Sequence, residues 1–233
     1  LECGGYIVMF IISAGFALLS LVIIMATGKN FNLANTLQSK PAKAKLVVLD
    51  KKALPASVTM FLFLIPYGAI STFIALYAVK INIANGGIFF TLMAITTVLM
   101  RVMAGRTVDR VGEKPIVIIS TVVQLVSLAL LALWPGLVSF IISALFFGVG
   151  FGMMSPTMQA MAVRTAPPHR RGAASSTYLC AFDCGIGLGG VIAGYLLRFL
   201  GYPQMFAIML LFTLAAFIVY YGWARRGKTR LKI

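Results

Sequence analysis

The chain contains 233 residues, of which 61% are hydrophobic and only 11% are charged, and its formal net charge is +15. Because a soluble domain carries about 25% charged residues, this composition excludes an ordinary soluble domain and indicates a protein solvated by lipid. The lysines and arginines separate long apolar runs instead of covering one surface, so the positive charge favours a membrane protein and argues against nucleic-acid binding.

Seven apolar runs are long enough to cross a bilayer, which takes about 20 residues of α-helix. The fold class predicted is therefore all-α integral membrane, with seven transmembrane helices. The first run begins a few residues after Leu1, without the basic segment and short core of a signal peptide. We therefore expect a fragment or processed chain cut just before a membrane helix. The predicted spans are residues 6–27, 57–79, 86–104, 115–134, 137–163, 173–197 and 204–223.

The basic residues are distributed unevenly between the two sides of these spans. Eighteen of the 20 lysines and arginines fall in the connections 28–56, 101–114 and 164–172 and in the C-terminal tail. Only Lys80 and Arg198 fall on the other side. Because basic loops stay in the cytoplasm, we predict an outward-facing N-terminus and a cytoplasmic C-terminus.

The long connection divides the chain into three predicted parts. Residues 1–27 form a single membrane helix, residues 28–56 a cytoplasmic linker, and residues 57–233 a six-helix unit with a basic tail. Within the linker, residues 42–52 (AKAKLVVLDKK) have the pattern of an amphipathic surface helix.

The connection at residues 101–115, RVMAGRTVDRVGEKP, combines glycine with charges of both signs between two apolar runs. Glycine permits a tight turn, and Asp109 can accept hydrogen bonds from the free N–H groups that open the next helix. Two interpretations stay open: a gate or interface element, or a basic loop with a helix cap and no moving part. The candidate gating residues are Arg101, Gly105, Asp109, Arg110 and Gly112.

Glycines and prolines inside the spans predict how the helices pack. Glycines recur four residues apart at 148 and 152, at 185 and 189, and at 190 and 194, a spacing that lets helix backbones approach closely in lipid. Pro66 and Pro156 lie mid-span and are expected to kink or break their helices.

The pattern Gly105-x-x-x-Asp109-Arg110-x-Gly112-x-Lys114 resembles the short cytoplasmic loop signature of the major facilitator superfamily of secondary transporters, although Glu113 stands where a basic residue is common. The segments GVGFGMMSP (148–156), PPHRRGAASS (167–176) and DCGIGLG (183–189) are similar to the tenth and eleventh helices of bacterial drug and metabolite exporters in that superfamily. Residues 6–27 would then match the sixth helix, and the first five helices are missing.

The resemblance implies a C-terminal half-transporter built from two inverted three-helix repeats, which works by alternating access against an N-terminal half. It implies proton-coupled export of a small molecule across the bacterial inner membrane. The first helix of each repeat would line the cavity, here 57–79 and 137–163. Polar groups on those spans include Tyr67, Ser71, Thr72, Tyr77, Ser155, Thr157 and Gln159. Tyr67 and Gln159 are the substrate candidates, and for each hydroxyl the alternative is a bond to its own helix.

Asp183 is the only acidic residue inside a predicted span, and an ionisable group at that depth is a functional candidate. Three interpretations remain: proton coupling or cation binding, a structural hydrogen bond, or a soft-metal site with Cys180 and Cys184 that lacks a visible third ligand. His169 is expected to be solvated.

The sequence shows no catalytic constellation, metal site or cofactor motif, so we predict a protein that is not an enzyme and binds no cofactor. The predicted partners are a small-molecule substrate, protons, the lipid bilayer and the missing N-terminal half. The alternative is a non-transporting membrane scaffold or assembly partner.

Overall fold

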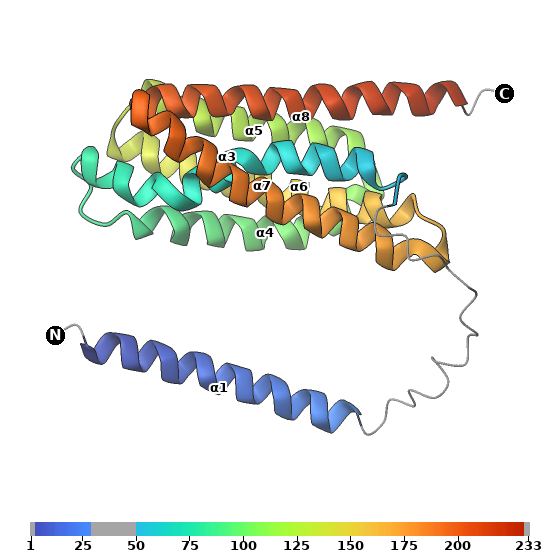
Figure 1. The fold of residues 1–233 in the computed structure, drawn as a ribbon, viewed down its shortest axis with the longest axis horizontal. Helices are drawn as coiled ribbons and strands as arrows, with labels where there is room; N and C mark the ends of the chain where they lie inside the picture. The colour runs from blue at the N-terminus through green and yellow to red at the C-terminus, as the bar shows by residue number, and fades with distance from the viewer. Residues whose placement is uncertain (1–2, 29–49, 231–233) are drawn as a thin grey trace. The chain divides into compact units, whose positions relative to one another are not determined.

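The computed structural model describes residues 3–28 and 50–230, and it divides into two units, Leu1–Leu46 and Val47–Ile233 (Figure 1). The first unit contains one apolar helix, α1 (Cys3–Gly28). The second contains six long helices, each long and apolar enough to cross a membrane. All seven predicted spans are therefore helical, and the all-α membrane fold class is confirmed.

The helices of the second unit follow one another with short connections. A 3₁₀ turn, η1 (Pro168–Arg170), precedes α7 and carries His169, which is exposed as expected. The six helices are α3 (Leu54–Lys80), α4 (Gly87–Val111), α5 (Glu113–Leu133), α6 (Leu137–Arg164), α7 (Arg171–Phe199) and α8 (Tyr202–Arg230).

Three local expectations are corrected. The connection expected at residues 101–114 is mostly helix, because α4 continues to Val111 and the turn consists of Gly112 alone, whose φ of +82° favours glycine. The prolines at 66 and 156 lie within continuous helices, so the expectation of a break is wrong for both, and the expected kinks stay a prediction. Of the expected surface helix 42–52, residues 51 and 52 form a turn, and residues up to 49 lie outside the described part.

The packing of the six helices repeats after three. Helix α3 packs against α7 and α8, while α6 packs against α4 and α5. If α3, α4 and α5 are exchanged with α6, α7 and α8 respectively, the contacts of α3 become the contacts of α6. Two further contacting pairs, α5–α8 and α3–α6, are unchanged by this exchange. Consecutive spans alternate in direction, so the two three-helix repeats are inverted relative to each other, as predicted.

Two glycine seams hold the closest helix pairs together. On the α3–α7 seam, a Cβ at Gly185 would lie 2.6 Å from the Phe61 carbonyl oxygen, and one at Gly189 would meet the Ile65 carbonyl oxygen. On the α4–α6 seam, a Cβ at Gly152 would lie 2.8 Å from the Thr97 carbonyl oxygen. The seams join equivalent helix pairs of the two repeats. A Cβ at Gly190 or Gly194 would also meet α3, 2.9 Å from Thr72 Oγ1 and 3.3 Å from the Phe73 ring, so the packing role predicted for the glycine pairs is confirmed.

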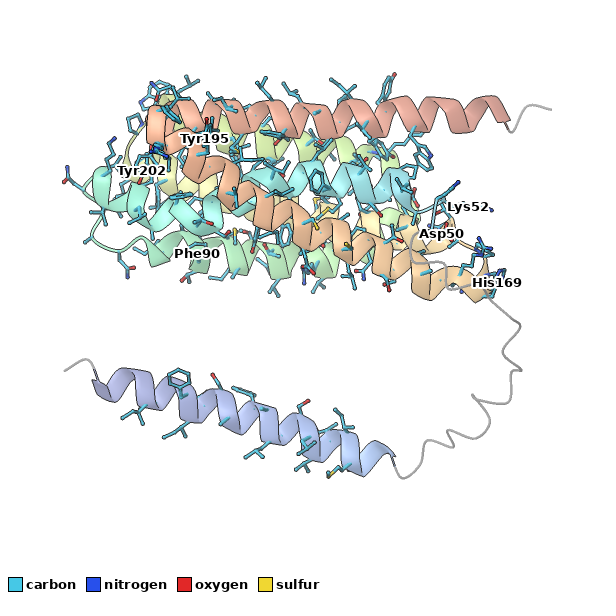
Figure 2. The ribbon with its side chains drawn as sticks, in the orientation of Figure 1. Asp50, Lys52, Phe90, His169, Tyr195 and Tyr202 are labelled. Carbon is cyan, nitrogen blue, oxygen red and sulfur yellow. The ribbon has the colours of Figure 1, made fainter. Side chains whose placement is uncertain are left out.

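The two ends of the unit differ in chemistry. Figure 2 shows Asp50, Lys52 and His169 at one end, and Phe90 and Tyr202 at the other. At the charged end, the Asp50 backbone N–H donates to Thr177 Oγ1 over 3.0 Å, which ties the start of α3 to α7. At the other end, Lys80 Nζ lies 5.3 Å from the centre of the Tyr202 ring.

Candidate functional site

The exposed surface of the six-helix unit is polar on some helices and apolar on others. Between their ends, α5 and α8 expose only apolar side chains, including Val122, Val126, Leu211 and Ile218. Figure 1 shows α5 and α8 along one side of the unit and α4 along the opposite side. Helices α3, α4, α6 and α7 expose polar side chains among apolar ones. Six of these polar residues define what we call the polar face: Ser71, Thr72, Arg101, Gln159, Ser176 and Asp183.

Five aromatic rings from three of those helices lie together at mid-depth. The Tyr67 ring of α3 is 4.8 Å from the Phe151 ring of α6 and 6.0 Å from that of Phe147, centroid to centroid. Phe182 of α7 is 6.2 Å from both Phe151 and Tyr178. We call these five residues the aromatic cluster.

Helix register explains the depth of this cluster. Tyr67 lies thirteen residues from either end of α3, and Phe151 lies at the middle of α6. At a rise of about 1.5 Å per residue, both rings are about 20 Å from the ends of their helices. The first helix of each repeat thus contributes one of the two central rings.

A single cation approaches this cluster. The Arg101 guanidinium carbon of α4 lies 5.7 Å from the centre of the Phe151 ring, within the range of a cation–π interaction. Within the described residues, the one ion pair joins Arg164 to Glu113 over 3.4 Å, so Arg101 has no carboxylate partner there.

Most hydroxyl groups singled out from the sequence bond within the bundle. Ser71 and Thr72 both donate to the Gly68 carbonyl, and Thr157 donates to Met153. Tyr77 donates across helices to the Leu131 carbonyl over 3.0 Å. These groups hold helices rather than ligands.

Tyr67 and Gln159 differ from those hydroxyl groups. Tyr67 is half-buried and Gln159 is exposed, and neither side chain makes a hydrogen bond in the part of the chain that the structure describes. Tyr67 belongs to the aromatic cluster, whereas Gln159 lies about three turns of α6 beyond Phe147. Both polar groups remain available to a ligand or to another part of the protein.

Asp183 is exposed on α7, and so are Cys180 and Cys184. Among the described residues, Asp183 forms no ion pair, and no three His, Cys, Asp or Glu side chains gather as they would around a metal ion. The buried face of α7 is a different one, formed by residues such as Tyr178, Gly185 and Gly189.

The candidate gating residues fall into two groups. Arg101 and Gly105 belong to α4, and Gly112 is the N-cap of α5. The side chains of Asp109 and Arg110 lie outside the described part, although the backbone of both is helical. The cap expected from Asp109 is corrected, because Gly112 takes that position and Glu113 supplies the acidic group of the first turn.

Sequence reasoning missed the buried polar residues of α5. Gln124 is 1% exposed and its Nε2 donates to the Phe63 carbonyl of α3 over 3.0 Å and to Thr213 Oγ1 of α8 over 3.4 Å. Ser127 and Ser143 donate to each other's carbonyl oxygens between α5 and α6. The sequence feature that could have identified these polar residues is their position within an otherwise apolar run.

Fold and site together define a multi-pass membrane bundle of inverted repeats, with a polar face on four of its six helices. The sequence profile of the Major Facilitator Superfamily matches residues 56–232, more than half of the chain. The chain belongs to that superfamily.

The similar proteins are transporters of greater length. An uncharacterised MFS-type transporter of Burkholderia mallei (strain SAVP1) is 27% identical over 194 residues, which cover 82% of this chain and 48% of that protein. The staphylopine export protein of Staphylococcus aureus (strain Mu50 / ATCC 700699) is 29% identical over 163 residues, covering 68% and 41%. The chain thus spans about half the length of the curated relatives it matches.

A solved structure has the same fold. The crystal structure of a POT family transporter in complex with 5-aminolevulinic acid aligns with a TM-score of 0.67 over 74% of this chain and 38% of that one. The sequence identity is 15%, so this likeness concerns the fold alone.

Proposed function

We propose that this chain is the C-terminal half of a transporter that exports a small molecule by alternating access, coupled to protons. The observation that carries the proposal is the division of the surface. The apolar faces of α5 and α8 suit lipid, whereas the polar face of α3, α4, α6 and α7 needs water or protein beside it. An N-terminal half packed against those four helices would enclose a central cavity.

The parts of the transporter follow from this arrangement. Residues 57–233 form the C-terminal half, residues 28–56 its cytoplasmic linker and residues 1–27 the last helix of the N-terminal half. Length supports this division, because the relatives are about twice as long as the matched segment. The name of the S. aureus relative favours export.

Proton coupling rests on Asp183, the acidic residue that lies well inside a described span, whereas Glu113 is the first residue of α5. A carboxylate exposed on the polar face at mid-depth can take up and release a proton as the two halves move. The distribution of basic residues places the C-terminus in the cytoplasm of a bacterial cell, with the Gly105–Gly112 segment beside the other half as a gate.

The test measures whether two positions on the polar face of the complete transporter become accessible in opposite conditions, one from outside and one from the cytoplasm. Thr72 lies in the outer half of α3, and Gln159 lies in the cytoplasmic half of α6. We would introduce Thr72→Cys and Gln159→Cys separately after replacing the native cysteines by serine. Membrane-impermeant maleimides would then be applied from outside and from inside at two pH values.

Alternating access predicts that a change of pH raises labelling of one position and lowers labelling of the other. Pro135→Cys, in the outer turn between α5 and α6, is the control that corrects for the pH dependence of thiol reactivity. Labelling of both positions in constant proportion would contradict the proposal and favour a static scaffold.

A further inference from the structure

We propose that Arg101 and the aromatic cluster select the substrate, and that the substrate is an organic anion carrying a planar ring. This inference rests on the proposed transport function and narrows it to a chemical class. Its basis is a cation held on a ring at mid-depth, without a carboxylate near it in the described structure.

An unpaired guanidinium at this depth needs an anionic partner. Arginine stays charged at all relevant pH values and carries five N–H donors in a planar fork that fits a carboxylate. The Arg101 guanidinium carbon lies 5.7 Å from the centre of the Phe151 ring, and its N–H donors can bind an anion beside that ring. The other described basic residues of α3, α5, α6 and α7 lie in the first or last turns of their helices: Lys80, Lys114, Arg164, Arg171 and Arg198. Arg101 is therefore the cation of the site.

The aromatic cluster supplies the surface for the rest of the ligand. Tyr67 and Phe151 contact each other as a tilted pair with ring centres 4.8 Å apart, and Phe182 extends the apolar surface toward α7. Aromatic rings prefer offset or edge-to-face contact with other rings. The Tyr67 hydroxyl, without a hydrogen bond in the described structure, can donate to the same anion that Arg101 binds.

Arg101 also disfavours cationic substrates. It is the charge found on the cluster in the described structure, and it is positive. A substrate that carries an ammonium group close to its ring would therefore meet a like charge.

The experiment uses three probes that share one ring and differ in charge. They are indole-3-acetate, indole-3-acetamide and tryptamine, titrated calorimetrically into the complete transporter in nanodiscs. Because a charge-assisted hydrogen bond is stronger than a neutral one, we expect indole-3-acetate to bind at least about tenfold more tightly than the amide, with tryptamine weakest.

Two substitutions separate the roles of charge and ring. Arg101→Gln is expected to reduce the affinity for indole-3-acetate to that for the amide, while Arg101→Lys keeps part of the preference. Phe151→Leu is expected to reduce the affinities for indole-3-acetate and indole-3-acetamide by the same factor. The matched controls are Arg198→Gln and Phe199→Leu, because Arg198 also lies over a ring, 6.0 Å from the centre of Phe199, at the other end of α7.

Several results would overturn the inference. They are equal affinity for the three probes, preference for tryptamine, absence of saturable binding, or an Arg101→Gln protein that still prefers the acetate. The last result together with lowered thermal stability would mean that Arg101 pairs with a carboxylate of the N-terminal half. Reciprocal labelling of Thr72→Cys and Gln159→Cys would persist in each case if the transport function holds, so the two proposals fail separately.

Discussion

The side-chain amide of Gln124 donates a hydrogen bond of 3.0 Å to the backbone carbonyl of Phe63, three residues before Pro66. Proline lacks an N–H and deprives the first half of α3 of one intrahelical hydrogen bond. A donor from α5 therefore reaches the backbone of α3 next to the point where the helix ladder is interrupted. The same nitrogen also reaches Thr213 of α8, so one residue connects three helices.

Gln124→Leu is expected to lower the free energy of unfolding by about 1–2 kcal/mol, since hydrogen bonds between membrane helices contribute on that order. The measurement is thermal unfolding of the purified protein. The control is Gln159→Leu, whose exposed side chain makes no hydrogen bond in the described structure and whose loss should change stability by less than about 0.5 kcal/mol. Equal effects of the two substitutions would show that Gln124 does not connect the helices.

The glycine seam between α3 and α7 gives a second prediction. Gly189→Ala places a methyl group against the Ile65 carbonyl, whereas Gly187→Ala meets nothing within 4 Å on the same helix. We expect the first substitution to cost about 1–3 kcal/mol of stability. The second should be neutral or slightly stabilising, because alanine favours a helix over glycine. Similar melting temperatures for both variants would contradict the close approach of α3 and α7.

The Gly105–Gly112 segment gives a third prediction, about motion. Asp109→Asn removes a charge and keeps the shape, so membrane insertion should stay normal while the reciprocal labelling of Thr72→Cys and Gln159→Cys diminishes. The control is Glu113→Gln, because Glu113 pairs with Arg164, whose side chain is 69% exposed, and exposed pairs contribute at most about 1 kcal/mol. Unchanged reciprocal labelling in the Asp109→Asn protein would leave the segment only a structural connection.

Asp183 gives a fourth prediction, about coupling. If Asp183 carries the proton, Asp183→Asn should abolish the pH dependence of the labelling ratio and leave folding intact, since asparagine keeps the size of the side chain. Asp183→Leu should also leave the thermal stability unchanged, because the carboxylate is exposed in the six-helix unit. Ser176→Ala, seven residues earlier on α7 and also exposed, is the control. A normal pH response of the Asn variant would remove Asp183 from the mechanism.

The orientation in the membrane gives a fifth prediction. Cysteines introduced at Lys43 and Lys228 should react only from the cytoplasmic side, and cysteines at Lys80 and Pro135 only from outside. The physical reason is the concentration of lysine and arginine on one side of the spans. Reaction of the Pro135→Cys protein from the cytoplasm would contradict the orientation.

The sequence by itself determined the class of the protein and the location of its helices. Apolar runs of about 20 residues must form helices in lipid, because each backbone polar group has to be satisfied within its own segment. For the same reason, a glycine or a charged residue between two apolar runs indicated where one helix ends and the next begins. The extent of α4 was misjudged, because charged residues are compatible with a helix that continues past the hydrocarbon core.

Only the tertiary structure decided which residues come together. Tyr67, Arg101 and Phe151 lie on three helices and are separated by 34 and 50 positions in the sequence, yet their side chains meet at one depth. Gln124 and Phe63 meet in the same way across α5 and α3. Helix periodicity fixes which residues share a face of one helix, but the partner of that face depends on how closely the helices pack, and the glycine seams set that distance.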